Sequence, residues 1–354
     1  MKKRMLFGFL CSLLMGSDLV AQDYLAMARP KDSKEWGYID EKGKMVIKAQ
    51  YRTCFPFNEE GYAVVNENRK FMFIDTKGKE LKTGYKKFYL KEFSFGFGAG
   101  TVLAFNDGLA PIRERKGWGF LNKEGKLAIE MKYDNVSGFK DGLAFAIIKN
   151  KFFILDPSGK ETAVNVKDIV EIKRPSEGMV AYRAKNKLMG FVNGEGEAVI
   201  KAKYIAVGRF VAGVAWARNT DDQFGYIDKK GNWVIKPQFD AVKNFDPVAG
   251  LARVKDKDGW GYINKDGKKL KLNIETEVYG DFVDGLAKGR KDKKFGFFGP
   301  DGNWVIKPQL QGVGKVSSGF IPAKENDLWG FIDMKGKWVI EPQFEGIRKM
   351  VKVN

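Results

Sequence analysis

Residues 35–44 read Glu-Trp-Gly-Tyr-Ile-Asp-Glu-Lys-Gly-Lys, and variants of this stretch recur along the whole chain. Nine copies begin at an aromatic residue or a methionine, namely Trp36, Phe71, Trp118, Phe152, Met189, Phe224, Trp260, Phe295 and Trp329. Successive starts lie 34 to 37 residues apart, except for one interval of 47 residues between the second and third copies. A constant period of this size predicts a tandem-repeat protein in which each unit buries its apolar face against the next.

Each unit encodes a strand, a tight turn and a second strand. Glycine follows the first residue in seven units, Asp or Asn stands fifth in eight, and glycine stands eighth in all nine. Asp or Asn caps a β-turn with its own side chain, and glycine adopts the left-handed conformation without steric cost. The repeat positions that we expect to carry the structure are Trp36, Gly37, Gly43, Trp118, Gly119, Gly125, Trp260, Gly261, Gly267, Trp329, Gly330 and Gly336.

A third apolar stretch, introduced by glycine, completes the unit, as in Gly250-Leu251-Ala252. Pro237 predicts that the second strand stops there, because proline has no donor for a sheet ladder. The sequence therefore predicts an all-β fold of nine short antiparallel three-stranded units, stacked as an open curved array or as propeller-like rings. One ring usually has about four to eight blades, which favours an open or divided array.

The first 21 residues have the features of a secretory signal peptide. Lys2, Lys3 and Arg4 precede an apolar run from Met5 to Met15, and small residues lead to Ala21. The run is too short to span a bilayer, although an uncleaved anchor is an alternative. We expect an exported protein, located in the periplasm, on the cell surface or outside the cell. Residues 22–354 then form one repeat domain without a transmembrane helix.

The composition restricts the chemistry. The chain has no histidine and a net charge of +18, or +16 once residues 1–21, with three cations and one acid, are removed. Without histidine, the commonest general base and zinc ligand are absent. The single Asp or Asn of each turn supplies too few oxygens for calcium and indicates a turn cap. Cys54, the one cysteine after residue 21, is expected to pack as a small apolar residue. No cofactor motif is present.

These repeats resemble the bacterial WG-repeat family, also called KWG repeats. The closest copies are residues 35–44 and Leu328-Trp329-Gly330-Phe331-Ile332-Asp333, and the resemblance covers the chain from Leu25 onward. The poorest copy begins at Phe152, where Phe153 replaces the glycine. The family is known as a repeat architecture without a common catalytic function, so the resemblance implies a fold and no particular activity.

The irregular interval between the second and third units is the best local candidate for a contact site, because insertions in repeat proteins often form the binding face. Its candidate residues are Lys86, Lys87, Phe88, Tyr89, Lys91, Phe93, Phe95 and Phe97. An extra strand or a padding loop is the alternative interpretation. The recurring tryptophans could stack on sugars, but their interchange with Phe and Met favours core packing.

We therefore expect a non-catalytic scaffold that binds a protein or an anionic polymer of the cell envelope. The basic charge favours acidic partners, although a repeat also multiplies any solvated lysine. A carbohydrate-active enzyme or glycan-binding subunit is the alternative, since two carboxylates would suffice for a glycosidase. Nucleic acid is disfavoured as a partner by export. The sequence leaves the oligomeric state open.

Overall fold

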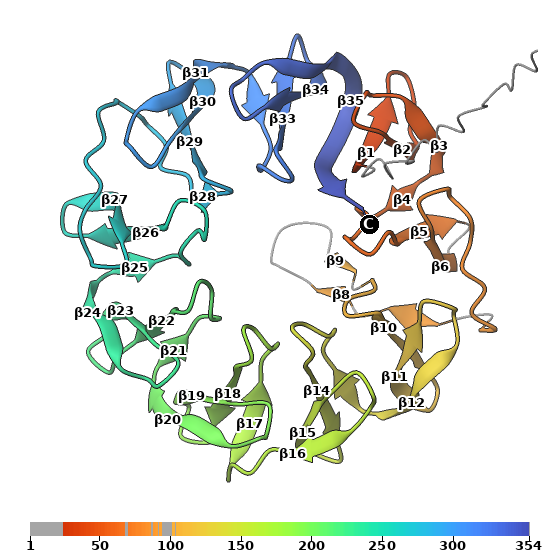
Figure 1. Ribbon diagram of the computed structural model, residues 1–354, viewed down its shortest axis with the longest axis vertical. Helices are drawn as coiled ribbons and strands as arrows, with labels where there is room; N and C mark the ends of the chain where they lie inside the picture. The colour runs from red at the N-terminus through yellow and green to blue at the C-terminus, as the bar shows by residue number, and fades with distance from the viewer. Residues whose placement is uncertain are drawn as a thin grey trace, which may run out of the picture.

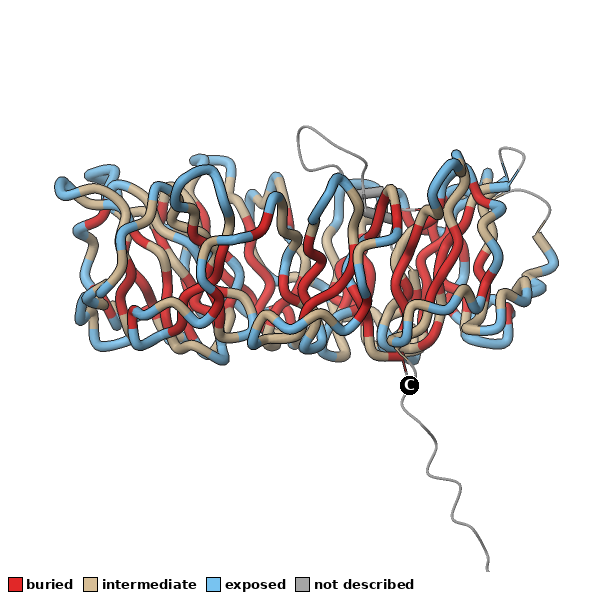
Figure 2. Tube along the Cα trace, turned by 90° about the horizontal axis from the view of Figure 1, so that it is seen from above, coloured by how far each residue is buried: buried red, intermediate tan, exposed pale blue. Residues whose placement is uncertain are grey.

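A computed structural model describes residues 24–67, 70–85, 88–90, 92–93, 101–102 and 104–353. The chain in these ranges forms antiparallel sheets arranged as nine blades of one closed ring around a central opening (Figure 1). Buried residues lie within the wall of the ring, and exposed turns cover its two faces (Figure 2). The described residues include no helix long and apolar enough to cross a membrane. The predicted all-β repeat fold is confirmed.

Within a blade, the strands lie side by side and are counted from the central opening to the outer edge. The innermost strands are β4 (Thr53–Cys54), β7 (Tyr89–Leu90), β13 (Asn135–Val136), β17 (Ile169–Ile172), β21 (Ala206–Val207), β25 (Ala241–Val242), β28 (Phe282–Val283) and β32 (Gly312–Val313). The second strands are β1 (Tyr24–Pro30), β5 (Ala63–Glu67), β10 (Leu109–Glu114), β14 (Ala144–Ile148), β18 (Val180–Ala184), β22 (Ala215–Arg218), β26 (Leu251–Asp256), β29 (Leu286–Lys291) and β33 (Phe320–Glu325).

The third strands carry the aromatic–glycine pairs. They are β2 (Trp36–Ile39), β6 (Lys70–Ile74), β11 (Gly117–Asn122), β15 (Lys151–Leu155), β19 (Met189–Val192), β23 (Phe224–Ile227), β27 (Gly259–Asn264), β30 (Lys294–Phe298) and β34 (Leu328–Asp333). The fourth, outermost strands are β3 (Met45–Tyr51), β12 (Leu127–Tyr133), β16 (Glu161–Ala163), β20 (Ala198–Tyr204), β24 (Trp233–Phe239), β31 (Trp304–Leu310) and the first half of β35 (Trp338–Lys352). Blades are numbered 1 to 9 in this order, from the blade of β1 to that of β33.

The two ends of the chain close the ring. The second half of β35 pairs antiparallel with β1, from Phe344 opposite Pro30 to Lys352 opposite Tyr24. It thereby supplies the innermost strand of blade 1, while its first half is the fourth strand of blade 9. The preference for an open or divided array was therefore wrong. The local repeat pattern contains no information about a strand that two blades share across the whole length of the chain.

Each predicted three-stranded unit gains a short innermost strand in the structure. Most innermost strands have only two residues, as in β21 and β25, which is too short for an alternating pattern to be visible. The prediction that Pro237 ends pairing was wrong, because β24 continues to Phe239, which pairs with Phe224. Proline is tolerated there because the fourth strand is the outer edge of its sheet and needs no donor on that side.

Aromatic pairs hold neighbouring blades together. Tyr226 of blade 6 meets Phe245 of blade 7 at a centroid distance of 4.8 Å, and its hydroxyl donates to the Lys243 carbonyl oxygen at 2.6 Å. The pairs Tyr38–Phe57, Phe120–Phe139, Phe191–Phe210 and Tyr262–Phe282 repeat this contact at 4.7 to 5.1 Å. Each such pair contributes about 0.5–1.5 kcal/mol beyond its buried area. Aromatic contacts at equivalent positions therefore make up much of the core between blades.

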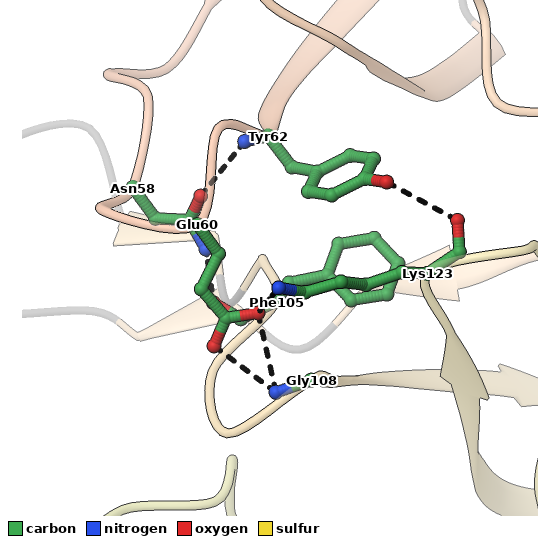
Figure 3. A network of polar contacts seen from close by, with 6 residues as sticks. All are labelled: Asn58, Glu60, Tyr62, Phe105, Gly108 and Lys123. Carbon is green, nitrogen blue, oxygen red and sulfur yellow. Dashed lines mark hydrogen bonds and ion pairs between the residues drawn. The ribbon is translucent and has the colours of Figure 1, made fainter. Parts of the chain in front are cut away.

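Carboxylates in the turns between innermost and second strands also link the blades. Glu60 of blade 2 accepts hydrogen bonds from the Gly108 N–H of blade 3 at 3.0 and 3.2 Å, and pairs with Lys123 Nζ at 3.1 Å (Figure 3). Equivalent hydrogen bonds are accepted by Asp107 from Gly142, by Asp141 from Glu177, and by Glu177 from Gly213. These bonds to charged acceptors fix neighbouring turns around the central opening.

Candidate binding surface around the central opening

The segments that follow the innermost strands border the central opening (Figure 1). Their backbones still pair with the second strands, as in Lys173 N–H to Ala181 O and Lys243 N–H to Arg253 O. Cations occupy these segments in blades 5, 6, 7 and 9, and in blade 1 they lie within the inner half of β35. We define the inner basic arc as Lys173, Arg174, Arg209, Lys243, Lys315, Arg348 and Lys349.

Several acidic side chains near these segments are already paired with cations. Glu171 pairs with Arg183 Nε at 3.0 Å and also with Lys173, Asp281 pairs with Arg253 Nε at 2.8 Å, and Glu277 pairs with Arg290 Nε at 2.9 Å. By contrast, Arg209, Lys243, Lys315 and Lys349 are exposed and form no ion pair with any residue that the structure describes. In blades 5, 6, 7, 9 and 1 the uncompensated charge at the opening is therefore positive, whereas blade 8 contributes the exposed carboxylate of Asp284.

Two arginines of the arc lie close enough to repel each other. Burial and the nearby charge of Arg209 hold the pKa of the Arg174 guanidinium below its usual range. A guanidinium nevertheless stays protonated in proteins, so both groups remain cations. The planar donor fork of arginine matches carboxylate and phosphate oxygens. An anion placed between Arg174 and Arg209 would relieve their repulsion.

Arg348 joins the arc to the first aromatic–glycine pair. The Trp36 ring lies 5.0 Å from the Arg348 guanidinium carbon and 5.7 Å from that of Arg29. Arg29 in turn pairs with Glu345 at 3.6 Å. The guanidinium of Arg348 is therefore held against an aromatic face at the seam where the chain ends meet.

The structure places only part of the predicted insertion. Figure 1 shows β8 (Glu92–Phe93) and β9 (Thr101–Val102), paired as a hairpin, on the side of blade 3 that faces the opening. Phe88 stacks on Phe73 at 5.8 Å in the core, whereas Tyr89 is 72% exposed. Phe93 lies in β8, and the predicted residues Lys86, Lys87, Lys91, Phe95 and Phe97 lie outside the described residues.

The tryptophans of the repeat divide into two groups by burial. Trp118 is buried, whereas Trp36, Trp260 and Trp329 are half-buried between blades. Trp36 and Trp329 pack against core clusters, and the Arg253 guanidinium carbon lies 4.4 Å from the Trp260 ring centroid. These contacts leave the tryptophans in separate blades rather than in one platform.

The repeat glycines serve two different close approaches. The glycine after the aromatic residue lies under the fourth strand: a Cβ on Gly37, Gly119 or Gly330 would be 2.4, 2.6 or 2.2 Å from a backbone oxygen of that strand. Gly43, Gly125, Gly267 and Gly336 have φ values of +76° to +89° in the turns. A Cβ on Gly336 would lie 3.0 Å from Ile306 of the preceding blade. At Gly261, by contrast, a Cβ would meet no atom within 4 Å.

The sequence pattern predicted an excess of positive charge but did not single out the residues of the inner basic arc. The repeat-equivalent lysines such as Lys44, Lys126 and Lys337 do lie on exposed turns. The arc residues instead occur where the copies differ: five lie one or two residues after a short innermost strand, and Arg348 and Lys349 lie within β35. No common neighbour marks them in the sequence: Arg209 precedes a phenylalanine, whereas Arg174 precedes a proline and Lys315 a valine.

Hollows between the blades are shallow and lie away from the arc. One, of about 480 Å³, is lined by Leu310, Lys337 and Trp338 between blades 8 and 9. Another, of about 440 Å³, is lined by Leu251, Lys271 and Asp301 between blades 7 and 8. Among the described residues, no three acidic or cysteine side chains gather closely enough to hold a metal ion. What the arrangement offers chemically is a set of fixed positive charges around an opening.

Comparison with known proteins identifies the repeat. The sequence pattern of the family described as "WG containing repeat" matches residues 36–71, 118–152, 189–221, 224–259, 295–329 and 329–351, more than half of the chain. These ranges omit the units that begin at Phe71, Phe152 and Trp260, whose blades lack the seven-residue fourth strand. A search of the curated proteins gives no match.

Three solved structures of low sequence identity align with the chain, one of them with a TM-score above 0.5. A structure described as "the eukaryotic initiation factor" aligns with a TM-score of 0.58 and 11% identity, over 93% of this chain and 98% of that chain. BamB from Moraxella catarrhalis aligns with a TM-score of 0.39 and 13% identity, over 80% and 94% of the two chains. PorZ of Porphyromonas gingivalis aligns with a TM-score of 0.32 and 11% identity, over 92% and 50%. Such identities concern the fold alone.

Proposed function

The chain belongs to the WG-containing-repeat family, and we propose that it is an exported, non-catalytic scaffold that binds an anionic partner at its central opening. The partner is a protein or an anionic polymer of the cell envelope. The observation that carries this proposal is the uncompensated positive charge of Arg209, Lys243, Lys315 and Lys349 around one opening.

Electrostatic arguments support the arc over the rest of the surface. Charges that line a concave low-dielectric rim focus the field and raise the local concentration of an oppositely charged partner. Isolated lysines on exposed turns are screened within about 8 Å at physiological ionic strength. An arc of cations on blades 5, 6, 7, 9 and 1 can contact several charges of one extended anion, whereas the scattered turn lysines cannot.

The test compares two triple variants with the same change in net charge. The arc variant carries Arg209→Gln, Lys243→Gln and Lys315→Gln. The control variant carries Lys44→Gln, Lys126→Gln and Lys230→Gln, all at exposed turn positions. Binding of a fluorescent polyuronate and of polyglutamate is measured at low and moderate salt.

We expect the arc variant to bind about tenfold more weakly, since three exposed ion pairs contribute about 0.2–1 kcal/mol each. The control variant is expected to lose less than about twofold. An equal loss in both variants would show that only net charge matters and would overturn the arc as the site. Turnover of the polyuronate would overturn the scaffold in favour of a carbohydrate-active enzyme.

A further inference from the structure

Blade 7 keeps the repeat glycine but lacks the strand that this glycine accommodates. In the six blades with a seven-residue fourth strand, a Cβ on that glycine would lie 2.2 to 2.6 Å from a backbone oxygen of the strand. At Gly261 of blade 7, no atom lies within 4 Å of the same position. Blade 7 therefore has an open space beside Gly261 where the six complete blades have the backbone of the fourth strand.

The other two blades with a short or missing fourth strand have lost the glycine. Met72 stands at this position in blade 2, where Glu80 bridges to Ile74 and the Leu81 N–H donates to the Phe73 carbonyl oxygen, and Met72 packs against the core. Phe153 stands there in blade 4, packs against the core and pairs with Ala163 of the three-residue β16. In both blades a large side chain fills the space. Blade 7 alone among the described blades leaves it open.

The chain starts the fourth strand of blade 7 and then leaves it. Lys269 bridges to Ile263, and the Leu270 N–H donates to the Tyr262 carbonyl oxygen at 2.8 Å. The backbone then turns to the next blade, where the Asn273 N–H donates to the Gly302 carbonyl oxygen at 2.9 Å. The outer half of the strand, opposite Gly259–Gly261, is missing.

The exposed edge of β27 has free pairing capacity. Backbone groups of every second residue point to the same side of a strand. Because the Tyr262 carbonyl points to the outer edge, the N–H and C=O groups of Trp260 do so too. In blade 6 the equivalent residue, Phe224, pairs with Phe239. An open sheet edge of this kind can accept an added strand.

Charge defines what kind of strand would fit. Lys255 lies directly opposite Trp260 on the neighbouring strand, and Lys257 lies in the adjoining hairpin turn. Lys271 lies where the chain departs, and these three lysines are exposed and form no ion pair with a described residue. Asp256 and Asp258 are already paired with Lys269, at 2.7 and 3.2 Å. The uncompensated charge beside the edge is positive.

We propose that the β27 edge at Gly259–Gly261 binds a short extended segment of an acidic partner protein, which completes the fourth strand of blade 7. The fourth strands of the chain itself show the pattern required. In β24, Ile235 and Phe239 are buried and the residues between them are exposed or half-buried. The segment therefore has apolar residues four positions apart and carboxylates on the exposed positions between or beside them. This inference concerns a different surface from the inner basic arc and stands without it.

The chain supplies a matched pair of probes. The peptide Ile-Glu-Pro-Gln-Phe-Glu has the sequence of residues 340–345, and Ile-Lys-Pro-Gln-Phe-Asp has that of residues 235–240. Each is labelled with a fluorophore and titrated with the full chain by fluorescence anisotropy. Hydrogen exchange of the Trp260 amide reports whether a strand has been added at the edge.

We expect the acidic peptide to bind about threefold or more tighter than the peptide of residues 235–240, whose Lys and Asp charges cancel, and to slow exchange at Trp260. Gly261→Ala should weaken binding about tenfold or more, because its Cβ would contact the peptide backbone as closely as in the six complete blades. The free energy of unfolding of the Gly261→Ala variant should not fall, since no atom of the chain lies near the added Cβ. Val234→Ala, on the exposed outer face of blade 6, should change nothing.

Three results would overturn the proposal. Equal binding by Gly261→Ala and the parent protein would show that the peptide does not bind beside Gly261. Equal binding of the two peptides would show that the site does not prefer an acidic segment. Self-association of the protein that Gly261→Ala abolishes would assign the edge to a second copy of the chain. The arc triple variant should still bind the acidic peptide, so failure of the proposed function and failure of this inference are distinguishable.

Discussion

The glycines of two neighbouring blades give a matched test of why the repeat needs its aromatic–glycine pair. Gly225 and Gly261 are equivalent residues of blades 6 and 7, and neither has a positive φ that would strain another residue. A Cβ at Gly225 would lie 2.4 Å from Ile235 O, 2.8 Å from Pro237 N and 2.9 Å from Lys236 C. At Gly261 it would meet nothing within 4 Å.

The expected difference follows from these distances. Gly225→Ala must displace the backbone of β24 by about 1 Å, and overpacking of this kind costs about 1–3 kcal/mol. Replacing glycine by alanine also stabilises a protein by about 0.4–1 kcal/mol through the unfolded state. Gly225→Ala should therefore lower the free energy of unfolding by about 1–2 kcal/mol, whereas Gly261→Ala should leave it unchanged or raise it slightly.

Urea unfolding followed by circular dichroism measures both variants against the parent protein. Because long repeat arrays can unfold in parts, hydrogen exchange in β23 and β27 provides a local reading of the same effect. If both variants shift the transition by the same amount, the contact between the glycine and the fourth strand does not explain the repeat. A neutral Gly225→Ala would refute the reasoning in the same way.

Three further predictions concern the blade contacts, the cysteine and the leader. Glu60→Ala should lower the free energy of unfolding, measured by thermal unfolding, by about 1–2 kcal/mol, because it leaves the Gly108 N–H without its acceptor. Glu60→Gln keeps an acceptor and should lower it less. An equal loss of stability in the two variants would contradict the importance of this hydrogen bond. Burial raises the pKa of the Cys54 thiol to about 12, so the reactive thiolate is scarce at pH 8. Iodoacetamide should therefore label Cys54 far more slowly in the native protein than in the urea-unfolded protein. Equal labelling rates would contradict the burial of Cys54. The protein recovered from its own cells should begin at Gln22, as Edman sequencing would show, and an intact Met1 would contradict signal cleavage.

Local features of the fold could be predicted from the sequence because they are local in cause. The turn at Asp228 is encoded by the residues that form it: Asp228 Oδ1 accepts the N–H groups of Lys230 and Asn232, each at 2.9 Å, and Gly231 has φ +83°. The continuation of β24 through Pro237 could not be predicted, because it depends on the strand being an outer edge. Ring closure depends on residues 344–352 meeting residues 24–30, which no repeat unit encodes.

The candidate sites were harder to predict because each is defined by comparison between blades in space. Arg174 and Arg209 are separated by one repeat and become neighbours only when their innermost strands line the same opening. Gly261 itself fits the repeat pattern, and its unit departs from that pattern only further along, where residues 269–274 lack the Trp-Val-Ile-Lys-Pro-Gln sequence seen at 233–238. Its significance comes from the strand that is absent beside it and from Met72 and Phe153 in the other incomplete blades.

Both the central opening and its arc of cations require that β1 and β35 pair within one chain. Tyr24 and Lys352 lie opposite each other at one end of this pairing and are both half-buried. In a protein that begins at Gln22 and carries Cys54→Ala, the substitutions Tyr24→Cys and Lys352→Cys place two thiols within reach of a disulfide. Mass spectrometry and non-reducing electrophoresis after mild oxidation should find a monomer with a single disulfide that joins the two chain ends. Free thiols, or disulfides formed only between chains, would contradict the closed ring.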